Sequence, residues 1–418
     1  MAYLGGTGGT GGTGGTGGTA ATLTSGMEMG LPVYGGVTPY SPALSAGIMA
    51  AQPDIAYQWW DHVDVPAQPT DTPTETLRRS APWVRHVVIM DELLGLMRTS
   101  AGPTSSGKTD TAGVSLQVNE IDALRIEWRD GSHGRMGSFE DAMRQQFNVV
   151  MDYAALRHDR FNEIHTQLGF PTPYFGTILG LHPERHKYTL EVISVAQNLA
   201  ASILMRFKTS FGMFRPDRMS AAVNPMVPTP GHPSFPAAHA AEAYIVAHLI
   251  AHLLPAGDDA QKKRVASLRR ALRQQAARIA ENRVVAGVHF PIDCFAGGLL
   301  GAHMGEILAV LAGHKHSGGQ PKVYPAKLDI NQLIGRERLD VPVGYKFDPA
   351  VTTGPSTEAD MPEGGKSDPG DGAEKQGNAA VSSIGLGEVF GKTAIKGLPG
   401  TLYFQALWKL AEAEWRPS

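Results

Sequence analysis

Three short segments of the chain concentrate side chains suited to binding and transforming a tetrahedral oxyanion: Lys208–Arg215, Pro233–His239 and Arg283–Asp293. The first supplies a lysine and an arginine, and the second ends in a histidine at the start of a predicted helix. The third supplies a second arginine, then a histidine with an aspartate four residues after it. Cations to hold an oxyanion and histidines to act on it are therefore present.

These residue types suit that chemistry for physical reasons. A guanidinium group donates two parallel hydrogen bonds to an oxyanion, whereas the ammonium group of lysine acts as a compact charge. The Pro-rich loop before His239 leads into a helix, and helix N-termini favour anions through free N–H groups and the macrodipole. His289 and Asp293 place an imidazole beside a carboxylate. We therefore expect one oxyanion site built from all three segments.

The order and spacing of these segments resemble the type 2 phosphatidic acid phosphatase (PAP2) superfamily, which includes vanadium-dependent haloperoxidases and acid phosphatases. The first segment matches K-x6-R-P, and the third matches R-x5-H-x3-D. The stretch 236–239, Pro-Ala-Ala-His, aligns with the family's P-S-G-H. The resemblance covers about Lys208 to Asp293 and the helices around them. One segment alone would be a weak match, whereas three in the right order are not expected by chance.

The resemblance implies which residues would hold the oxyanion. Lys208, Arg215 and Arg283 would bind the equatorial oxygens of vanadate or phosphate. The backbone N–H group of Ala238 would replace that of the family glycine. His232 would lie near the cofactor, because the loop Gly-His-Pro-Ser-Phe-Pro around it resembles that of bromoperoxidases. The resemblance thus implies vanadate as the cofactor, with phosphate as a competitor or alternative ligand.

The resemblance also implies three catalytic residues. His289 would be the axial ligand of vanadium in a haloperoxidase, and so the metal-binding residue, or the nucleophile in a phosphatase. Asp293 would orient His289. His239 would act as the acid–base residue near the apical oxygen.

Two residues depart from the family pattern. Ala237 stands where the family has serine, so one hydroxyl donor to the oxyanion is missing. Because a hydrogen bond to a charged group contributes about 1.5–3 kcal/mol, we expect weaker cofactor binding. Ala238 stands where the family has glycine and accepts only ordinary φ angles. Asn282, in place of a serine that often precedes the arginine, is a milder change.

Three functions are compatible with these residues. The first is a vanadate-dependent haloperoxidase that oxidises bromide or iodide with hydrogen peroxide and serves a small organic substrate. The second is an acid phosphatase, a phosphomonoesterase in which His289 attacks phosphorus and His239 protonates the leaving group. The third is a degenerate oxyanion-binding or assembly protein, which Ala237 and Ala238 favour. We favour the haloperoxidase, because we expect neither the spanning helices of membrane phosphatases nor the signal peptide of secreted ones.

The elements that must position these residues are predicted to be helices. Apolar residues recur every three or four positions, the spacing of one helix face, and sustained strand-like alternation is scarce. We therefore expect an all-α protein, a helical bundle with a four-helix-bundle core. The predicted helices cover about 81–97, 139–168, 188–208, 239–254, 258–282 and 291–312.

Composition divides the chain into five regions. Residues 1–30 are a flexible Gly/Thr-rich tail, and 31–135 an irregular and helical region packed on the core. The catalytic helical domain is expected over 136–350, a disordered linker over 351–382 and a C-terminal docking helix over 383–418. Because residues 397–415 are apolar on one face, we expect them to cover the body or a partner subunit. A homo-oligomer, at least a dimer, is predicted.

Charge and cysteine content exclude some partners. A net charge of −3 excludes a strong basic footprint for nucleic acid. The most apolar stretches carry polar residues, so no membrane insertion is expected. With Cys294 as the single cysteine, an intrachain disulfide is impossible, and we expect a cytoplasmic protein.

Three other patterns are predicted to be structural. Residues 102–109 match the phosphate-binding P-loop, but that motif needs a strand before it and a helix after it, and the sequence predicts neither. His248 and His252 lie one turn apart, like metal ligands, without a nearby glutamate or cysteine at zinc spacing. The cationic run 262–273 is typical of the solvated face of a long helix.

Overall fold

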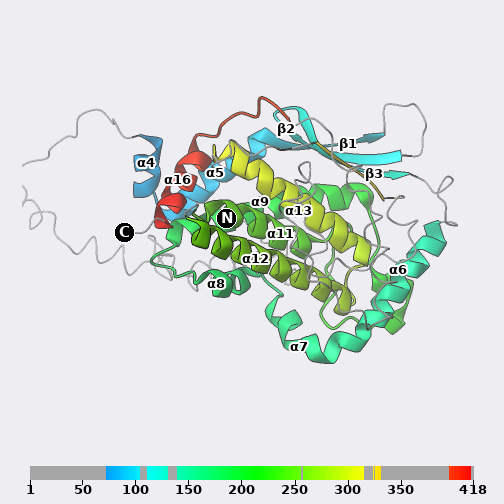
Figure 1. The fold of residues 1–418 in the computed structure, drawn as a ribbon. Coiled ribbons are helices and arrows are strands. Elements are labelled where there is room, and N and C mark those ends of the chain that lie inside the picture. The colour runs from blue at the N-terminus through cyan, green and yellow to red at the C-terminus, as the bar shows by residue number, and fades with distance from the viewer. Residues whose placement is uncertain are drawn as a thin grey trace, which may run out of the picture.

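The computed structural model describes residues 72–103, 111–129, 139–255, 258–314, 323, 325–330 and 395–415. Most of these residues are helical, so the predicted all-α class is confirmed, with a small sheet in addition (Figure 1). The predicted tail 1–30 and linker 351–382 lie outside the described residues. The predicted division into five regions stays a prediction.

The centre of the fold is helix α11 (Ala238–Leu253). It packs against α9 (Lys187–Phe211), α12 (Asp259–Val285) and α13 (Pro291–Leu311) (Figure 1). Nearly all side chains of α11 and α13 are buried, which explains why both helices are apolar on every face. The four-helix-bundle architecture stays a prediction, although these helices do supply the core around the three segments.

Glycines let α13 approach α11 closely. A Cβ atom at Gly297 would lie 2.2 Å from the backbone oxygen of Ala237, and one at Gly301 would lie 2.2 Å from that of Ala241. No side chain fits at such distances, so the two backbones touch. The N–H group of Ala237 also donates to the carbonyl of Asp293 at 2.8 Å. The start of α13 is thereby fixed beside the start of α11.

Shorter helices cover the outside of this core. The single helix predicted over 139–168 is wrong, because a 3-10 turn divides it at Ala154–Leu156. Tyr153 and Leu156 keep right-handed helical dihedral angles through that turn, so the apolar spacing continues while the axis changes direction. The outer elements are α4 (Pro73–Arg79), α5 (Pro82–Leu96), α6 (Phe139–Tyr153), α7 (Arg157–Thr166), α8 (Thr172–Leu179), α10 (Pro216–Met219) and η3 (Ala221–Val223).

A four-stranded sheet includes three strands from the region 31–135, for which the sequence predicts irregular and helical structure. Strands β1 (Met97–Pro103), β2 (Thr111–Val118) and β3 (Ile121–Arg129) are antiparallel, and β4 (Ala326–Asp329) adds parallel to β3. The alternation of Val114, Leu116 and Val118 is typical of a strand, but it is short and was missed. The P-loop-like stretch 102–109 begins in β1 and is followed by β2, not by a helix.

The C-terminal helix α16 (Tyr403–Glu414) packs on α4, α5 and α9 of its own chain. Glu92 on α5 accepts the N–H groups of Tyr403 and Phe404, the latter at 2.8 Å. Glu414 on α16 accepts the N–H groups of Tyr188 and Thr189 at 2.8 and 2.9 Å. The carboxylate of Glu92 thus satisfies free N–H groups at the start of α16, and that of Glu414 satisfies those at the start of α9. The predicted homo-oligomer stays a prediction.

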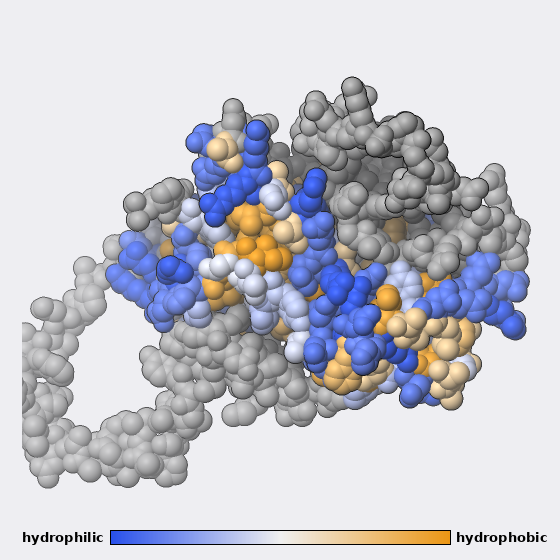
Figure 2. All heavy atoms as spheres, turned by 60° about the horizontal axis from the view of Figure 1, so that its bottom comes forward, coloured by the Kyte–Doolittle hydropathy of each residue, from blue (hydrophilic) through white to orange (hydrophobic). Residues whose placement is uncertain are grey.

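Two helices are long and apolar enough, by length and composition, to cross a membrane. They are Lys187–Met219 and Pro291–Leu311, and 78% and 89% of their apolar windows are buried inside the protein. On the face turned forward in Figure 2, hydrophilic side chains cover much of the described surface, with smaller apolar areas between them. The cytoplasmic location stays a prediction.

Candidate active site

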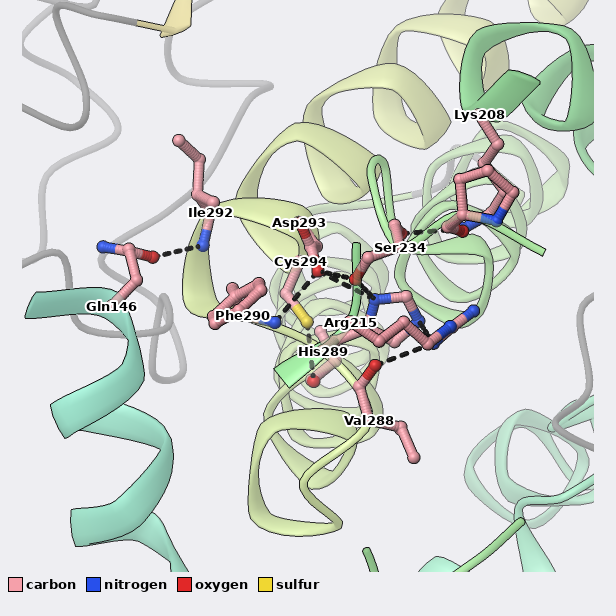
Figure 3. A network of polar contacts seen from close by, with 12 residues as sticks. Gln146, Lys208, Arg215, Ser234, Val288, His289, Phe290, Ile292, Asp293 and Cys294 are labelled. Atoms are coloured by element: carbon pink, nitrogen blue, oxygen red, sulfur yellow. Dashed lines mark hydrogen bonds and ion pairs between the residues drawn. The ribbon is translucent and has the colours of Figure 1, made fainter. Parts of the chain in front are cut away.

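His289 and Asp293 form a buried pair at the start of α13. Nδ1 of His289 lies 3.0 Å from Oδ2 of Asp293, which also accepts the N–H group of Phe290 at 2.9 Å and the hydroxyl group of Ser234 (Figure 3). Because an ionised carboxylate only accepts hydrogen bonds, Nδ1 carries the ring proton and Nε2 carries the lone pair. Nε2 is the atom that could bond to vanadium or attack phosphorus.

The protonation of this pair follows from its surroundings. Burial lowers the pKa of His289 well below its usual range, and the charges of Arg215 and Lys208 lower it further. Burial raises the pKa of Asp293, although the hydrogen bond from Ser234 opposes the rise. His289 is therefore neutral near pH 7, the state in which Nε2 keeps its lone pair.

Lys208 lies in the last turn of α9 and is fully buried. Its ammonium group donates to the backbone oxygens of Pro233 and Ser234, at 3.0 and 2.8 Å. Burial lowers the pKa of Lys208 well below its usual value, while the negative charges of Asp293 and Glu242 act in the opposite direction. Lys208 thus joins the first predicted segment to the loop of the second.

Arg215 joins the first segment to the third. One terminal nitrogen donates to the backbone oxygen of Val288 at 2.7 Å and lies 3.3 Å from Nε2 of His289 (Figure 3). The other terminal nitrogen lies 3.2 Å from Nδ1 of His232, and Nε donates to the backbone oxygen of the same histidine at 3.1 Å. Burial lowers the pKa of Arg215 only to about 10, so it stays a cation.

His232 lies half-buried at the edge of this cluster. Burial lowers its pKa to about 4, helped by the charges of Lys208 and Arg215, so the ring is neutral near pH 7. Its Nε2 atom is buried and has no hydrogen-bond partner in the part of the chain that the structure describes. A neutral imidazole with a free ring nitrogen can accept or donate one hydrogen bond to a ligand.

His239 and Arg283 meet at the end of helix α7. His239 Nε2 donates to the backbone oxygen of Gln167 at 2.7 Å. Arg283 makes long contacts, at 3.5 Å to that oxygen, 3.2 Å to the side-chain oxygen of Gln167 and 3.4 Å to the backbone oxygen of Ile164. Burial lowers the pKa of His239 well below its usual range, with the charge of Arg283 as the next cause.

Ala237 and Ala238 begin α11, as the alignment with P-S-G-H requires. Ala237 is the N-cap residue, with φ −72° and ψ 123°, and no side chain caps the helix there. Ala238 is the first helical residue, and both are buried. The nearby hydroxyl of Ser234 does not replace the missing family serine, because it is bound to Asp293.

Sequence reasoning missed three buried residues around the pocket. Ser234 is part of the second segment, where the alignment directed attention to the residues after it. Glu242 lies one turn after His239 on α11, and neither of its carboxylate oxygens has a partner among the described residues. Burial raises the pKa of Glu242 to about 8, against the charges of Lys208 and Arg283. Gln167 belongs to no motif, so no signal in the sequence marks it.

Comparison with known proteins adds one match. Residues 190–315 match the model of the PAP2 superfamily. No curated protein and no solved structure matches the chain. PAP2 superfamily members are phosphatases or haloperoxidases, which bears out the prediction of an enzyme.

The PAP2 match spans α9, α11, α12 and α13, and so includes every predicted site residue. The structure brings these residues together in two groups. Lys208, Arg215 and His232 lie around the pair of His289 and Asp293. The other group, His239 and Arg283, faces Gln167, and the charges of Lys208 and Arg215 reach it. The role of each residue stays a prediction.

Proposed function

We propose that this pocket binds vanadate and that the protein is a vanadate-dependent haloperoxidase. The observation that carries the proposal is the state of Arg283. Its side chain is fully buried, its Nε atom has no partner among the described residues, and its other contacts are 3.2–3.5 Å long. A buried donor without an acceptor is costly, and an oxyanion would supply the acceptors.

The pocket residues fit vanadate in number and kind. Among the described residues no group of three or more histidine, cysteine, aspartate or glutamate side chains could hold a metal cation. Vanadate needs instead one nitrogen ligand and several donors to its oxygens. His289 Nε2 would supply the ligand, and Lys208, Arg215, Arg283 and the N–H group of Ala238 would hold the oxygens. Bound there, vanadate would activate hydrogen peroxide toward a halide.

The residues of the chain would supply binding and protons. Oxidation of bromide by hydrogen peroxide consumes one proton and yields hypobromous acid and water: the peroxide is reduced and the bromide is oxidised. His239 carries a proton at Nε2 and would exchange it with the bound oxygen groups. His232 favours the haloperoxidase, because its free Nε2 can form a hydrogen bond with peroxide. A phosphatase has no need of this third histidine.

A phosphomonoesterase is the second candidate, and the tautomer of His289 suits it equally well. With the proton of His289 held at Nδ1, its Nε2 could attack phosphorus in line while the cations hold the other oxygens. His239 would protonate the leaving oxygen. Because vanadate and phosphate are both tetrahedral oxyanions, the same pocket suits both reactions.

A pair of assays on the full chain tests this. We expect bromination of a phenol dye with bromide and peroxide, dependent on added vanadate and inhibited by phosphate. Hydrolysis of a phosphate ester without halogenation would support the phosphatase instead. Absence of both activities and of vanadate and phosphate binding would contradict the proposal. The remaining function would then be the degenerate oxyanion-binding or assembly protein, and binding of another oxyanion would support it.

A further inference from the structure

Oxygen atoms at the C-terminal end of α7 accept hydrogen bonds from two donors of the oxyanion pocket, His239 and Arg283. Gln167 is completely buried, and its backbone oxygen accepts from His239 while its side-chain oxygen accepts from Arg283 at 3.2 Å. The backbone oxygen of Ile164 also faces Arg283. Three oxygens from one helix end therefore contact two of the residues that we assign to the oxyanion.

These oxygens are suited to stand in for an anion. The last carbonyl groups of a helix have no partners within it, and they carry the negative end of the macrodipole. Arg283 and His239 present donors to that end, much as they would to the oxygens of vanadate or phosphate. The contact thus reduces the cost of burying Arg283 when no oxyanion is bound.

The arrangement is nevertheless incomplete. In the described part of the chain, the side-chain nitrogen of Gln167 is buried without a hydrogen-bond partner, and so is Nε of Arg283. Each unsatisfied buried donor costs free energy. If an oxyanion took the place of Gln167, Arg283 would gain charged acceptors, and the amide of Gln167 could reach water. Both unmet donors would then be satisfied.

The structure also shows which part of α7 could move. Its body is held to α12, because Glu163 receives two hydrogen bonds from Arg278, at 2.8 and 2.6 Å, and one from Asn282 at 3.0 Å. Beyond Gln167 comes Gly169, which is exposed, and a Cβ atom there would contact nothing within 4 Å. Gly169 therefore allows the chain to bend after Gln167 while the helix stays in place, once Gln167 releases the hydrogen bond that its side-chain oxygen accepts from Asn282 at 2.9 Å.

We propose that Gln167 is an internal competitor of the oxyanion, which must leave Arg283 and His239 before vanadate or phosphate binds them. This inference rests on the proposed function, since it assumes an oxyanion in this pocket. It makes Gln167 a determinant of affinity: the weaker its hold on Arg283, the tighter the ligand binds. It also means that His239 becomes free to exchange its proton only when the ligand is present.

Hydrogen exchange on the unmodified protein tests the movement directly. The N–H group of Gln167 donates to the backbone oxygen of Glu163 at 3.0 Å, a bond that displacement would break. With saturating inorganic phosphate or orthovanadate, we expect faster exchange over residues 165–170 and slower exchange over 284–293. Unchanged or slower exchange over 165–170, alongside protection of 284–293, would overturn the proposal.

Affinity measurements on a variant test the competition. Gln167→Ala removes the side-chain contacts to Arg283 and Asn282, so we expect phosphate to bind roughly three- to tenfold more tightly by calorimetry. Gln197→Ala is the matched control, because Gln197 is similarly buried but its side-chain oxygen accepts from Thr172 rather than from Arg283. Equal or weaker binding by the Gln167 variant, with the control unchanged, contradicts the inference alone. Loss of phosphate and vanadate binding in the unmodified protein contradicts the proposed function itself.

Discussion

The two ends of helix α11 both carry buried histidines, but their surroundings differ. At the N-terminal end, His239 lies among Lys208, Arg215 and Arg283, so positive charges outnumber the nearby carboxylates. At the C-terminal end, His248 Nδ1 and His252 Nε2 share one carboxylate, that of Glu306, at 3.2 and 3.1 Å. The positive charges at the N-terminal end exceed the negative charges around them. The two histidines at the C-terminal end, in contrast, both have the carboxylate of Glu306 as a partner.

The C-terminal end has a structural explanation for its polar residues. A cavity of about 70 Å³ there is lined by His248, His252, Glu306, Arg269 and Arg273 among others. Arg269 donates to the free backbone oxygen of Ala251, as basic residues often do at a helix end. The prediction that the histidine pair is structural agrees with this arrangement. A histidine alone therefore does not mark a site, whereas uncompensated cations and unmet donors do.

The largest expected effect is the loss of ligand binding and activity at one end of α11 but not at the other, and one pair of variants tests it. His289→Ala removes the lone pair on which either reaction depends, and we expect loss of vanadate binding and of activity by at least about 100-fold. His248→Ala, at the far end, should leave both unchanged to within a few-fold. Equilibrium dialysis with vanadate and the halogenation and phosphate-ester assays check this. Wild-type vanadate affinity in the His289 variant would show that the third segment is wrongly assigned.

Two glycines of α13 allow the two ends of α11 to be compared through their packing, because Gly297 contacts the start of α11 and Gly305 contacts a residue near its end. A Cβ atom at Gly297 would lie 2.2 Å from a backbone oxygen of Ala237, whereas one at Gly305 would lie 2.8 Å from Cβ of His248. Both alanine variants should lose stability, by roughly 1–3 kcal/mol, because α13 must move away. Urea unfolding measures that loss. Only Gly297→Ala should also weaken phosphate binding, since it displaces the start of α11; an equal loss of binding in both variants would remove the distinction.

Glu242, which is buried, and Glu306, which is half-buried, should respond to pH with opposite signs. Burial raises the pKa of Glu242 to about 8 from 4.5, so the folded protein holds a proton that the unfolded chain releases, and stability falls as pH rises from 4.5 to 8. Burial also opposes ionisation of Glu306, but His252 and His248 together lower its pKa below 4.5, so its contribution is present above pH 4.5 and lost below.

Unfolding at pH 5 and pH 8 checks that difference. Glu242→Gln should gain stability at pH 8 relative to the unmodified protein, by about 1 kcal/mol or more, and show little change at pH 5. Glu306→Gln should lose stability at pH 8. The same sign of change for both variants at pH 8 would contradict the assigned charge states.

The smallest effect concerns the missing family serine. Ala237→Ser would place a hydroxyl group at the N-cap of α11, beside a bound oxyanion, where a hydrogen bond contributes about 1–2 kcal/mol. We expect roughly tenfold tighter vanadate binding. A higher melting temperature without bound oxyanion would report capping separately, because serine is a good N-cap residue. Unchanged affinity would mean that the pocket has rearranged around Ala237.

Much of the fold could be predicted from the sequence, because the long helices have clear apolar spacing. The predicted helix at 291–312 and the observed α13 differ by one residue at the end. The sheet was missed because its strands mix polar with apolar residues, and only a short stretch of β2 alternates regularly. Motif order identified Lys208 and His289 as members of one cluster, and the structure brings them together.

Other features of the pocket could not be predicted. Gln167 approaches Arg283 from 116 residues away, and no pattern near either residue indicates that contact. Glu242 has no hydrogen-bond partner among the described residues, and its environment depends on what α9 and α12 place around it, which spacing along α11 cannot reveal. Ser234 precedes the aligned motif by only two residues, but its contact with Asp293, 59 residues away, follows from the fold and not from a local pattern.

The contact between α11 and α13 has a mechanical consequence. Where two backbones touch without side chains between them, neither helix can slide or tilt without breaking van der Waals contact along its length. His239 lies on α11, and His289 lies two residues before α13. Because these two helices are rigidly packed, we expect the separation of the two histidines to change little when a ligand binds. Any compliance has to come from the segment that follows α7, where Gly169 is exposed. The pocket thus combines a rigid part, which keeps the two histidines at a fixed separation, with a flexible part, which can move when a ligand binds.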